Sequence, residues 1–223
     1  MTMGQLIMKD IRIQKKYILL GFLFVGFVFF ALGAFEGLPL SMPAAIFSHF
    51  LIVVASKSDE KNNNGRLLAS MPLRRRDIVT AKYLGMFVFA AFAFALTAFW
   101  RLLSASVLPA NELPWFDLPS TLLTIAILLV FYSIYFPLFF AYGSRISQVL
   151  DLVVIFAVGG AVVITFRIIE WTNGGTGILL RDWLSPDSGL DLTTIGLCGA
   201  GFGLVLTVIS WFAAVALYER RSL

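Results

Sequence analysis

Three ionisable side chains within long apolar stretches have the types and positions that could do chemistry. His49 lies inside one stretch, and Arg101 and Arg167 lie toward the ends of two others. Such groups mark functional positions in a membrane by default, because an unpaired charge in hydrocarbon is costly. A histidine with no acidic partner in its own span is also typical of a hydrogen bond between helices, and we favour this for His49. Snorkelling toward the membrane surface accounts for Arg101, with recognition of an anionic group as the alternative. Arg167 is spaced to pair with Glu170, three residues further on.

The sequence contains no motif for the common membrane-enzyme or pump chemistries. It lacks the G-x-x-x-x-G-K-[ST] phosphate loop, the H-E-x-x-H zinc motif and the G-x-S-x-G elbow. No span carries the central pair of carboxylates expected of an ion-coupled carrier. With one cysteine, Cys198, and one histidine, neither a disulfide within the chain nor a metal site is expected. We therefore expect no enzyme activity, no metal and no cofactor bound by this chain; if it transports, the energy comes from elsewhere.

The composition is that of a multi-pass membrane protein. The chain is 59% hydrophobic and 13% charged, whereas soluble domains are roughly 45–50% apolar and about 25% charged. The net charge of +4 does not indicate a nucleic-acid partner, because most of the bases flank apolar stretches on one side of the membrane. Membrane lipids are the expected surroundings.

The elements that position these residues are transmembrane helices. We expect an all-α membrane protein with a single transmembrane domain over residues 1–223 and both termini in the cytoplasm. Six spans are expected, at about 17–35, 39–55, 82–107, 118–142, 149–171 and 193–218.

Two further segments complete the expected layout. Residues 1–16 have the pattern of an amphipathic helix lying in the membrane interface. A plain flanking tail and a cleaved signal peptide are the alternatives, because both are also rich in basic residues. Residues 172–192 contain an apolar stretch too short to cross the membrane, which predicts an external re-entrant segment or a surface loop with a Trp anchor.

The distribution of charge sets the orientation. Every Lys and Arg other than Arg101, Arg167 and Arg181 falls on one side of these spans. Cytoplasmic segments carry the excess of basic residues, so this side, with residues 56–81, is predicted to be cytoplasmic. Gly199 and Gly203 in the last span form a small-residue face suited to close helix packing.

Residues 56–81 form the longest polar run in the chain, SKSDEKNNNGRLLASMPLRRRDIVTA. Arg66 to Met71 can form one to two helical turns that end at Pro72, and Asp77 suits the first turn of the next helix. A short helix held between two spans can dock into another protein. A solvated loop with orienting charges is the alternative.

This run, with the residues that follow it, resembles the first cytoplasmic loop of ABC-2 type transporter permeases. The resemblance rests on Asp59-Glu60, a short helix, Ser70-Met71-Pro72, Arg75, Ile78-Val79 and Ala81-Lys82-Tyr83-Leu84. It is sharpest toward the small six-span branch that includes exporters of phenol-soluble modulins, which are antimicrobial peptides. Met71 and Arg74 replace the Leu and the small polar residue common there.

The resemblance implies a type V exporter-like fold in which the short helix is a coupling helix that sits in a groove of a separate ATPase. It implies that the docking residues are Asp59, Glu60, Arg66, Leu67, Leu68 and Met71. ATP and Mg²⁺ would bind to that ABC ATPase subunit. A second copy of the chain, or a homologous permease, would complete the pathway.

The function implied is export across the plasma membrane of a hydrophobic or amphipathic substrate, such as a peptide or an antibiotic-like molecule. Two other classes remain open on the residues alone. A membrane scaffold would use the same loop to hold a cytoplasmic partner without transport, and a secondary carrier would transport without ATP.

Overall fold

The chain folds into a bundle of helices. The computed structural model describes residues 3–31, 39–61, 74–107, 115–143, 149 and 192–220. The helices described are α1 (Met3–Ile13), α2 (Lys15–Ala31), α3 (Ser41–Lys61), α5 (Arg75–Val107), α6 (Leu118–Tyr142) and α9 (Leu192–Arg220). The predicted span at 149–171 and the re-entrant segment at 172–192 lie outside the described residues, apart from Val149 and Leu192.

Three of these helices are long and apolar enough to cross a membrane. They cover Arg75–Ser106, Leu118–Tyr142 and Thr193–Arg220, and a shorter apolar helix covers Ser41–Ser56. The described part of the chain contains no strand, as an all-α membrane protein requires.

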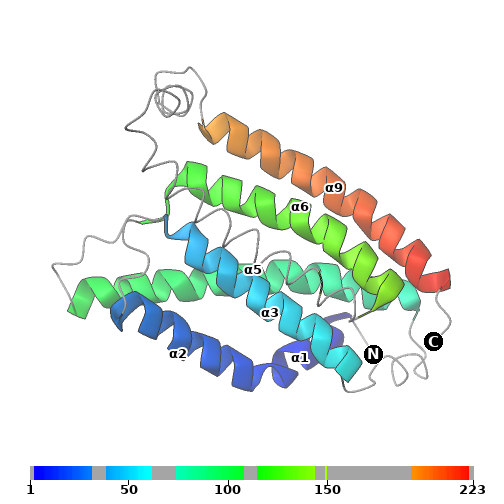
Figure 1. The fold of residues 1–223 in the computed structure, drawn as a ribbon, viewed down its shortest axis with the longest axis horizontal. Coiled ribbons are helices and arrows are strands. Elements are labelled where there is room, and N and C mark those ends of the chain that lie inside the picture. The colour runs from blue at the N-terminus through cyan, green and yellow to red at the C-terminus, as the bar shows by residue number, and fades with distance from the viewer. Residues whose placement is uncertain are drawn as a thin grey trace.

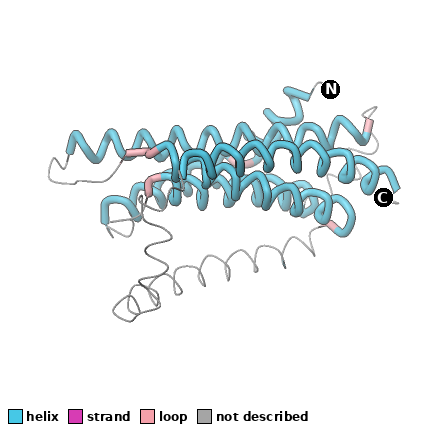
Figure 2. The backbone as a smooth tube through the Cα atoms, turned by 90° about the horizontal axis from the view of Figure 1, so that it is seen from above, coloured by secondary structure: helices cyan, strands magenta, loops and turns pink. Residues whose placement is uncertain are grey.

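The long helices lie side by side along the long axis of the molecule (Figure 1). α6 packs against α9, and α3 lies against both α5 and α6. α2 covers α3 and α5, and the short α1 lies across the beginning of α5. The view from above shows the same near-parallel arrangement (Figure 2). α1, the end of α3, the beginning of α5 and the end of α9 therefore share one end of the bundle.

Small residues of α9 allow its close approach to α6. A Cβ placed on Gly203 would lie 2.9 Å from the Cβ of Leu129, and one on Gly199 would lie 3.2 Å from the Cβ of Ala126. These are distances between rigid parts of two helices, so larger residues would push the helices apart. The predicted packing face of the last span is therefore confirmed, and its partner is α6.

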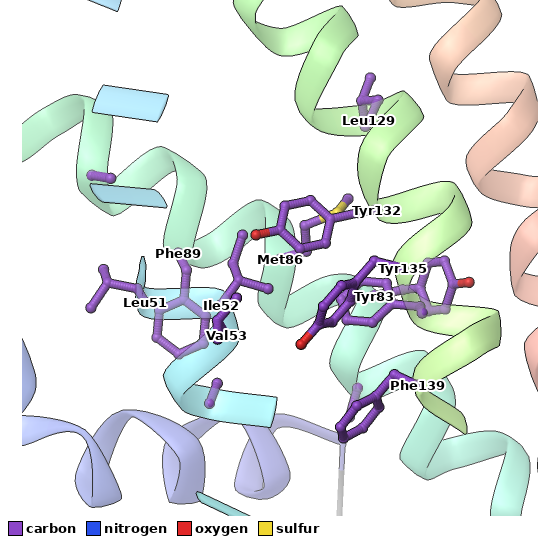
Figure 3. Packing of buried hydrophobic residues seen from close by; sticks show 14 of the residues in the cluster. Leu51, Ile52, Val53, Tyr83, Met86, Phe89, Leu129, Tyr132, Tyr135 and Phe139 are labelled. Atoms are coloured by element: carbon purple, nitrogen blue, oxygen red, sulfur yellow. The ribbon is translucent and has the colours of Figure 1, made fainter. Parts of the chain in front are cut away.

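Aromatic side chains of α6 form the centre of the core (Figure 3). They pack against aliphatic residues of α3 and against the first half of α5. The largest fully buried hydrophobic side chains are Tyr132, Tyr135, Phe136, Leu51 and Val79. Buried aromatic rings contribute large contact areas, and they hold α3, α5 and α6 together.

Two helices extend further into the polar run than the predicted spans do. α3 continues to Lys61 rather than ending near residue 55, and α5 begins at Arg75 rather than at Lys82. Backbone hydrogen bonding continues beyond the apolar stretch, and Asp77 lies in the first turn of α5, where an acid favours a helix start. The segment without a described helix between them is thus limited to residues 62–74.

Candidate functional site

The first turns of α5 contact four other helices at the basic end of the bundle. This cluster, which we call the α5 anchor, comprises Arg75, Arg76, Thr80, Lys82 and Tyr83. It follows directly on residues 62–74, the segment predicted to meet an ATPase. Its contacts show which helices are joined to the beginning of α5.

Lys82 joins α5 to α1 and α3. Its Nζ donates to Asp10 Oδ2 at 2.8 Å and to the carbonyl oxygen of Ala55 at 3.1 Å. Lys82 is 9% exposed and Asp10 is 5% exposed. Lysine and aspartate are almost never buried to this degree unless they are paired. The ion pair therefore fixes the N-terminal helix to the bundle, and the contact with Ala55 brings together the two helices that flank residues 62–74.

Arg75 joins α5 to the end of α9. Its Nη1 donates to the carbonyl oxygens of Tyr218 at 2.8 Å and Glu219 at 2.9 Å. The guanidinium also lies 5.7 Å from the centre of the Tyr218 ring. The last carbonyls of a helix lack partners within it and carry partial negative charge, so a cation placed there stabilises the helix end.

Arg76 and Thr80 hold the Trp211 side chain of α9 between them. The Arg76 guanidinium lies 4.7 Å from the centre of the Trp211 ring. The indole Nε1 donates to Thr80 Oγ1 at 3.0 Å, and that hydroxyl donates to the Arg76 carbonyl at 2.8 Å. One tryptophan thus uses both its ring face and its N–H group on α5.

Tyr83 begins a chain of hydroxyl groups across three helices. Its Oη lies 2.6 Å from Ser210 Oγ on α9, and Ser210 Oγ donates to the Ser133 carbonyl on α6 at 2.6 Å. A serine hydroxyl has one proton, so Tyr83 is the donor in the first of these bonds. Tyr83 is buried, and this path satisfies its hydroxyl inside the bundle.

Together these contacts make the beginning of α5 a junction between several helices. Charge-assisted and buried hydrogen bonds with specific geometry hold it to α1, α3 and α9, and through Ser210 to α6. A displacement of the preceding segment would be passed to several helices at once.

The predicted docking residues are only partly within the described structure. Asp59 and Glu60 lie in the last turns of α3, and their side chains lie outside the description. Arg66, Leu67, Leu68 and Met71 lie outside the described residues, as does Arg167. Their roles stay predictions.

His49 contacts α6. Its Nδ1 lies 2.9 Å from Tyr132 Oη, and its ring meets Phe131 edge-on with centroids 5.3 Å apart. This is the hydrogen bond between helices that the packing interpretation of His49 predicts.

Arg101 lies at the other end of α5, but it does not extend into solvent. The side chain is 8% exposed, and its guanidinium lies 5.1 Å from the centre of the Trp115 ring. Snorkelling and recognition of an anionic group both stay predictions for Arg101. Trp115, which immediately precedes α6, covers the guanidinium and keeps the side chain within the bundle.

Comparison with known proteins provides the family. A family profile described as "ABC-2 family transporter protein" matches residues 5–219. The chain belongs to the ABC-2 transporter family. Comparison with curated proteins and comparison with solved structures both found no match.

Family membership gives the α5 anchor its context. ABC-2 proteins are the membrane component of transporters, are not themselves catalytic, and generally work with an ATPase subunit. In this ABC-2 protein the residues that tie α5 to its neighbours lie within or just before the Ala81-Lys82-Tyr83-Leu84 motif.

The sequence did not reveal what these anchor residues contact. Their partners include Asp10, Ser210, Trp211 and Tyr218. Of these four only Asp10 carries a signal in the sequence, because it is an acid among the basic residues of the first helix, but no buried partner was predicted for it. The distance of 72 residues to Lys82 concealed which partner it was.

Proposed function

We propose that this chain is the permease subunit of an ATP-driven exporter in the plasma membrane, energised by a separate ABC ATPase. The observation that carries the proposal is the family match, which covers nearly the whole chain. Six spans with both termini in the cytoplasm belong to the same proposal. The described helices are consistent with it, because the basic ends of α1, α3, α5 and α9 gather at one end of the bundle.

The α5 anchor supports a coupling mechanism. ATP binding closes a pair of ATPase subunits and displaces the segment at residues 62–74. The anchor passes this displacement to α1, α3 and α9, so the helices move as a body rather than singly. ATP thus shifts the population between two conformations of the permease, and no chemistry occurs on the chain.

An apolar cavity supports a hydrophobic or amphipathic substrate. It has a volume of about 260 Å³ and lies between α3, α5 and α6. Its wall includes Ile52, Met86, Phe94, Leu128 and Tyr132. Tyr132 is also the partner of His49, which places a polar contact next to apolar space. Such a combination suits a molecule with a large apolar part.

A pathway between two membrane halves completes the proposal. Large apolar side chains are exposed along α9, including Phe202, Val205, Val208, Ile209 and Phe212. In a membrane these faces meet lipid or another permease subunit. We assign the second half to another copy of this chain or to a homologous permease.

Co-purification tests the central claim. The full chain is expressed in a mild detergent with a P-loop ATPase that carries an ABC signature and is encoded in a neighbouring reading frame. We expect the ATPase to co-elute with the wild type. It should be lost from a variant in which Asp59, Glu60 and Arg66 are alanine.

A variant matched in charge provides the control. Alanine at Glu36, Asp187 and Arg181 also removes two acids and one base, but in segments predicted to be external. This variant should retain the ATPase. Equal retention by both variants would refute the docking site, and failure of any ATPase to bind the wild type would refute the permease function.

A further inference from the structure

The outer end of α5 buries a positive charge that the α5 anchor does not involve. Arg101 is 92% buried, as its exposure of 8% implies. Its Nε and Nη1 have no hydrogen-bond partner among the residues that the structure describes. One turn further on, Ser104 is 1% exposed, and its Oγ likewise has no partner there. Two buried donor groups thus lie on the same face of α5.

The ring of Trp115 does not satisfy these donors. The guanidinium carbon lies 5.1 Å from the centre of the ring, and a ring face offers the N–H groups no oxygen or nitrogen acceptor. A cation–π contact stabilises the charge modestly, by an amount well below the cost of burying an unpaired ion. The in-plane N–H groups therefore still require an acceptor.

No described acid supplies that acceptor. Asp117 is the acidic residue described near this end, and its carboxylate caps α6 by accepting from the backbone N–H of Ser120 at 2.9 Å and from the Ser120 hydroxyl. Asp10, Asp77 and Glu219 lie on the elements of the α5 anchor, at the opposite end. Arg101 is separated from Lys82 by 19 positions, which is about 28 Å along a helix.

Arg101 lies at the depth of a membrane boundary. The span from Lys82 is close to the thickness of the hydrocarbon core, about 30 Å. α3 and α6 both begin at this end, and their first turns meet where Ser41 Oγ donates to Ser120 Oγ at 3.3 Å. Helix N-termini carry partial positive charge and favour anions.

We propose that Arg101 and Ser104 bind the oxyanion of an anionic amphiphile, a phosphate or a carboxylate, that enters from the outer leaflet. The assignment of this end of α5 to the outer leaflet rests on the proposed function and its orientation. An apolar portion is expected because Arg101 is largely buried in the bundle near a membrane boundary, where lipid surrounds the helices. The ligand supplies the acceptor oxygens that the described residues lack.

Binding is linked to conformation. Nε and Nη1 are shielded from solvent here, so the side chains around Arg101 must part to admit an oxyanion. The ligand consequently favours a conformation other than the one observed. In that conformation the end of α5 and the beginning of α6 are further apart.

Titration with short-chain lipids tests the proposal on the purified full chain in a neutral detergent. The probe is dioctanoyl phosphatidylglycerol, compared with dioctanoyl phosphatidylcholine and with inorganic phosphate, and the readout is the thermal unfolding temperature. We expect a saturable rise with phosphatidylglycerol and a weaker one with phosphatidylcholine. In R101Q the half-saturating concentration should increase roughly ten- to hundredfold, as expected for loss of a charged hydrogen bond.

Two variants make the result specific. R12Q removes an exposed base from α1 at the opposite end and should leave the half-saturating concentration within about twofold, on the expectation that exposed charges contribute little. R101K keeps a cation and should retain part of the affinity. If R101Q fails to fold, S104A serves in its place, and unchanged binding by S104A refutes the role of Ser104.

Three outcomes would overturn the proposal. R101Q could respond to phosphatidylglycerol as the wild type does, or inorganic phosphate alone could give the same shift, which would identify a soluble anion. The third is that Glu112 is the partner of Arg101. In that case E112Q and R101Q would lower the unfolding temperature equally, and the double variant would lower it no further.

These outcomes are separable from failure of the proposed function. R101Q should still co-purify with the ATPase, because Arg101 lies at the far end from residues 62–74. If R101Q loses lipid binding but retains the ATPase, the result bears on the Arg101 site and not on the transporter assignment. Loss of the ATPase from the wild type concerns the transporter assignment alone.

Discussion

Neutralising Asp10 gives a direct test of the α5 anchor. In D10N the side chain keeps its shape, but Lys82 loses the counter-charge at 2.8 Å. The amide oxygen that the substitution introduces at position 10 can still accept a hydrogen bond from Lys82 Nζ. The variant therefore isolates the contribution of charge from that of packing.

The magnitude follows from distance and burial. At 2.8 Å the Coulomb attraction is about 6 kcal/mol for an effective dielectric constant near 20. Desolvation offsets most of this in the intact pair, but removing one partner of a buried ion pair typically costs about 3–5 kcal/mol. Because a hydrogen bond remains, we expect about 3 kcal/mol for D10N. On the scaling for chains of this size, that is roughly 6–12 °C in unfolding temperature.

The assay is thermal unfolding of the purified chain, with ATPase stimulation measured alongside. K9M is the matched control, because Lys9 Nζ lies 3.4 Å from Asp10 Oδ1 with 22% of its side chain exposed, and such partly exposed pairs contribute about 0–1 kcal/mol. The double variant D10N/K82M should recover most of the stability, since a neutral pair of similar volume leaves no buried charge.

Two results would refute the reasoning. D10N as stable as the wild type would show that the pair is not buried in the membrane-embedded protein. A double variant as unstable as the sum of its two single variants would show that the residues act independently. If stability recovers in the double variant but ATPase stimulation does not, the ion pair itself carries the coupling.

Two further predictions concern α6. G203A should lower the unfolding temperature by several degrees, because its Cβ would meet that of Leu129, whereas G201A, with nothing within 4 Å, should be neutral or raise it slightly through helix propensity. Hydrogen bonds from Ser120 lower the pKa of Asp117, so its capping contribution is fully present above its unfolded pKa near 3.9 and is lost as the pH falls through the lower folded pKa. D117A should therefore have a free energy of unfolding about 1 kcal/mol lower than the wild type at pH 6, and this difference should disappear well below pH 4. A persistent difference at pH 2 would contradict the role of the carboxylate.

Much of the fold was predictable because membrane spans are encoded locally. The extents of α6 and α9 closely follow the apolar stretches expected at 118–142 and 193–218. The ends of α3 and α5 were less predictable, because a helix that leaves the apolar region is stabilised by capping and packing rather than by hydropathy. Arg75 illustrates this, since its contact with the end of α9 depends on a helix 143 residues away.

The candidate site was only partly predictable. The sequence pointed to residues 56–81 and, through the family resemblance, to Lys82 and Tyr83 as part of a motif. It did not show that Lys82 is buried against Asp10 and Ala55, because that contact joins three separate helices. His49 was correctly placed in a contact between helices, but its partner Tyr132 became evident only when α3 and α6 were seen together.

The sequence by itself determined that this is a helical membrane protein, which side of each span is basic, and where the polar run lies. These properties follow from composition and charge along the chain, because the membrane selects for them segment by segment. The tertiary structure decided which charges are paired. Lys82 and Arg101 are both buried cations of α5. Lys82 is paired with Asp10, whereas Arg101 has no described acceptor, because pairing depends on which groups the neighbouring helices bring close.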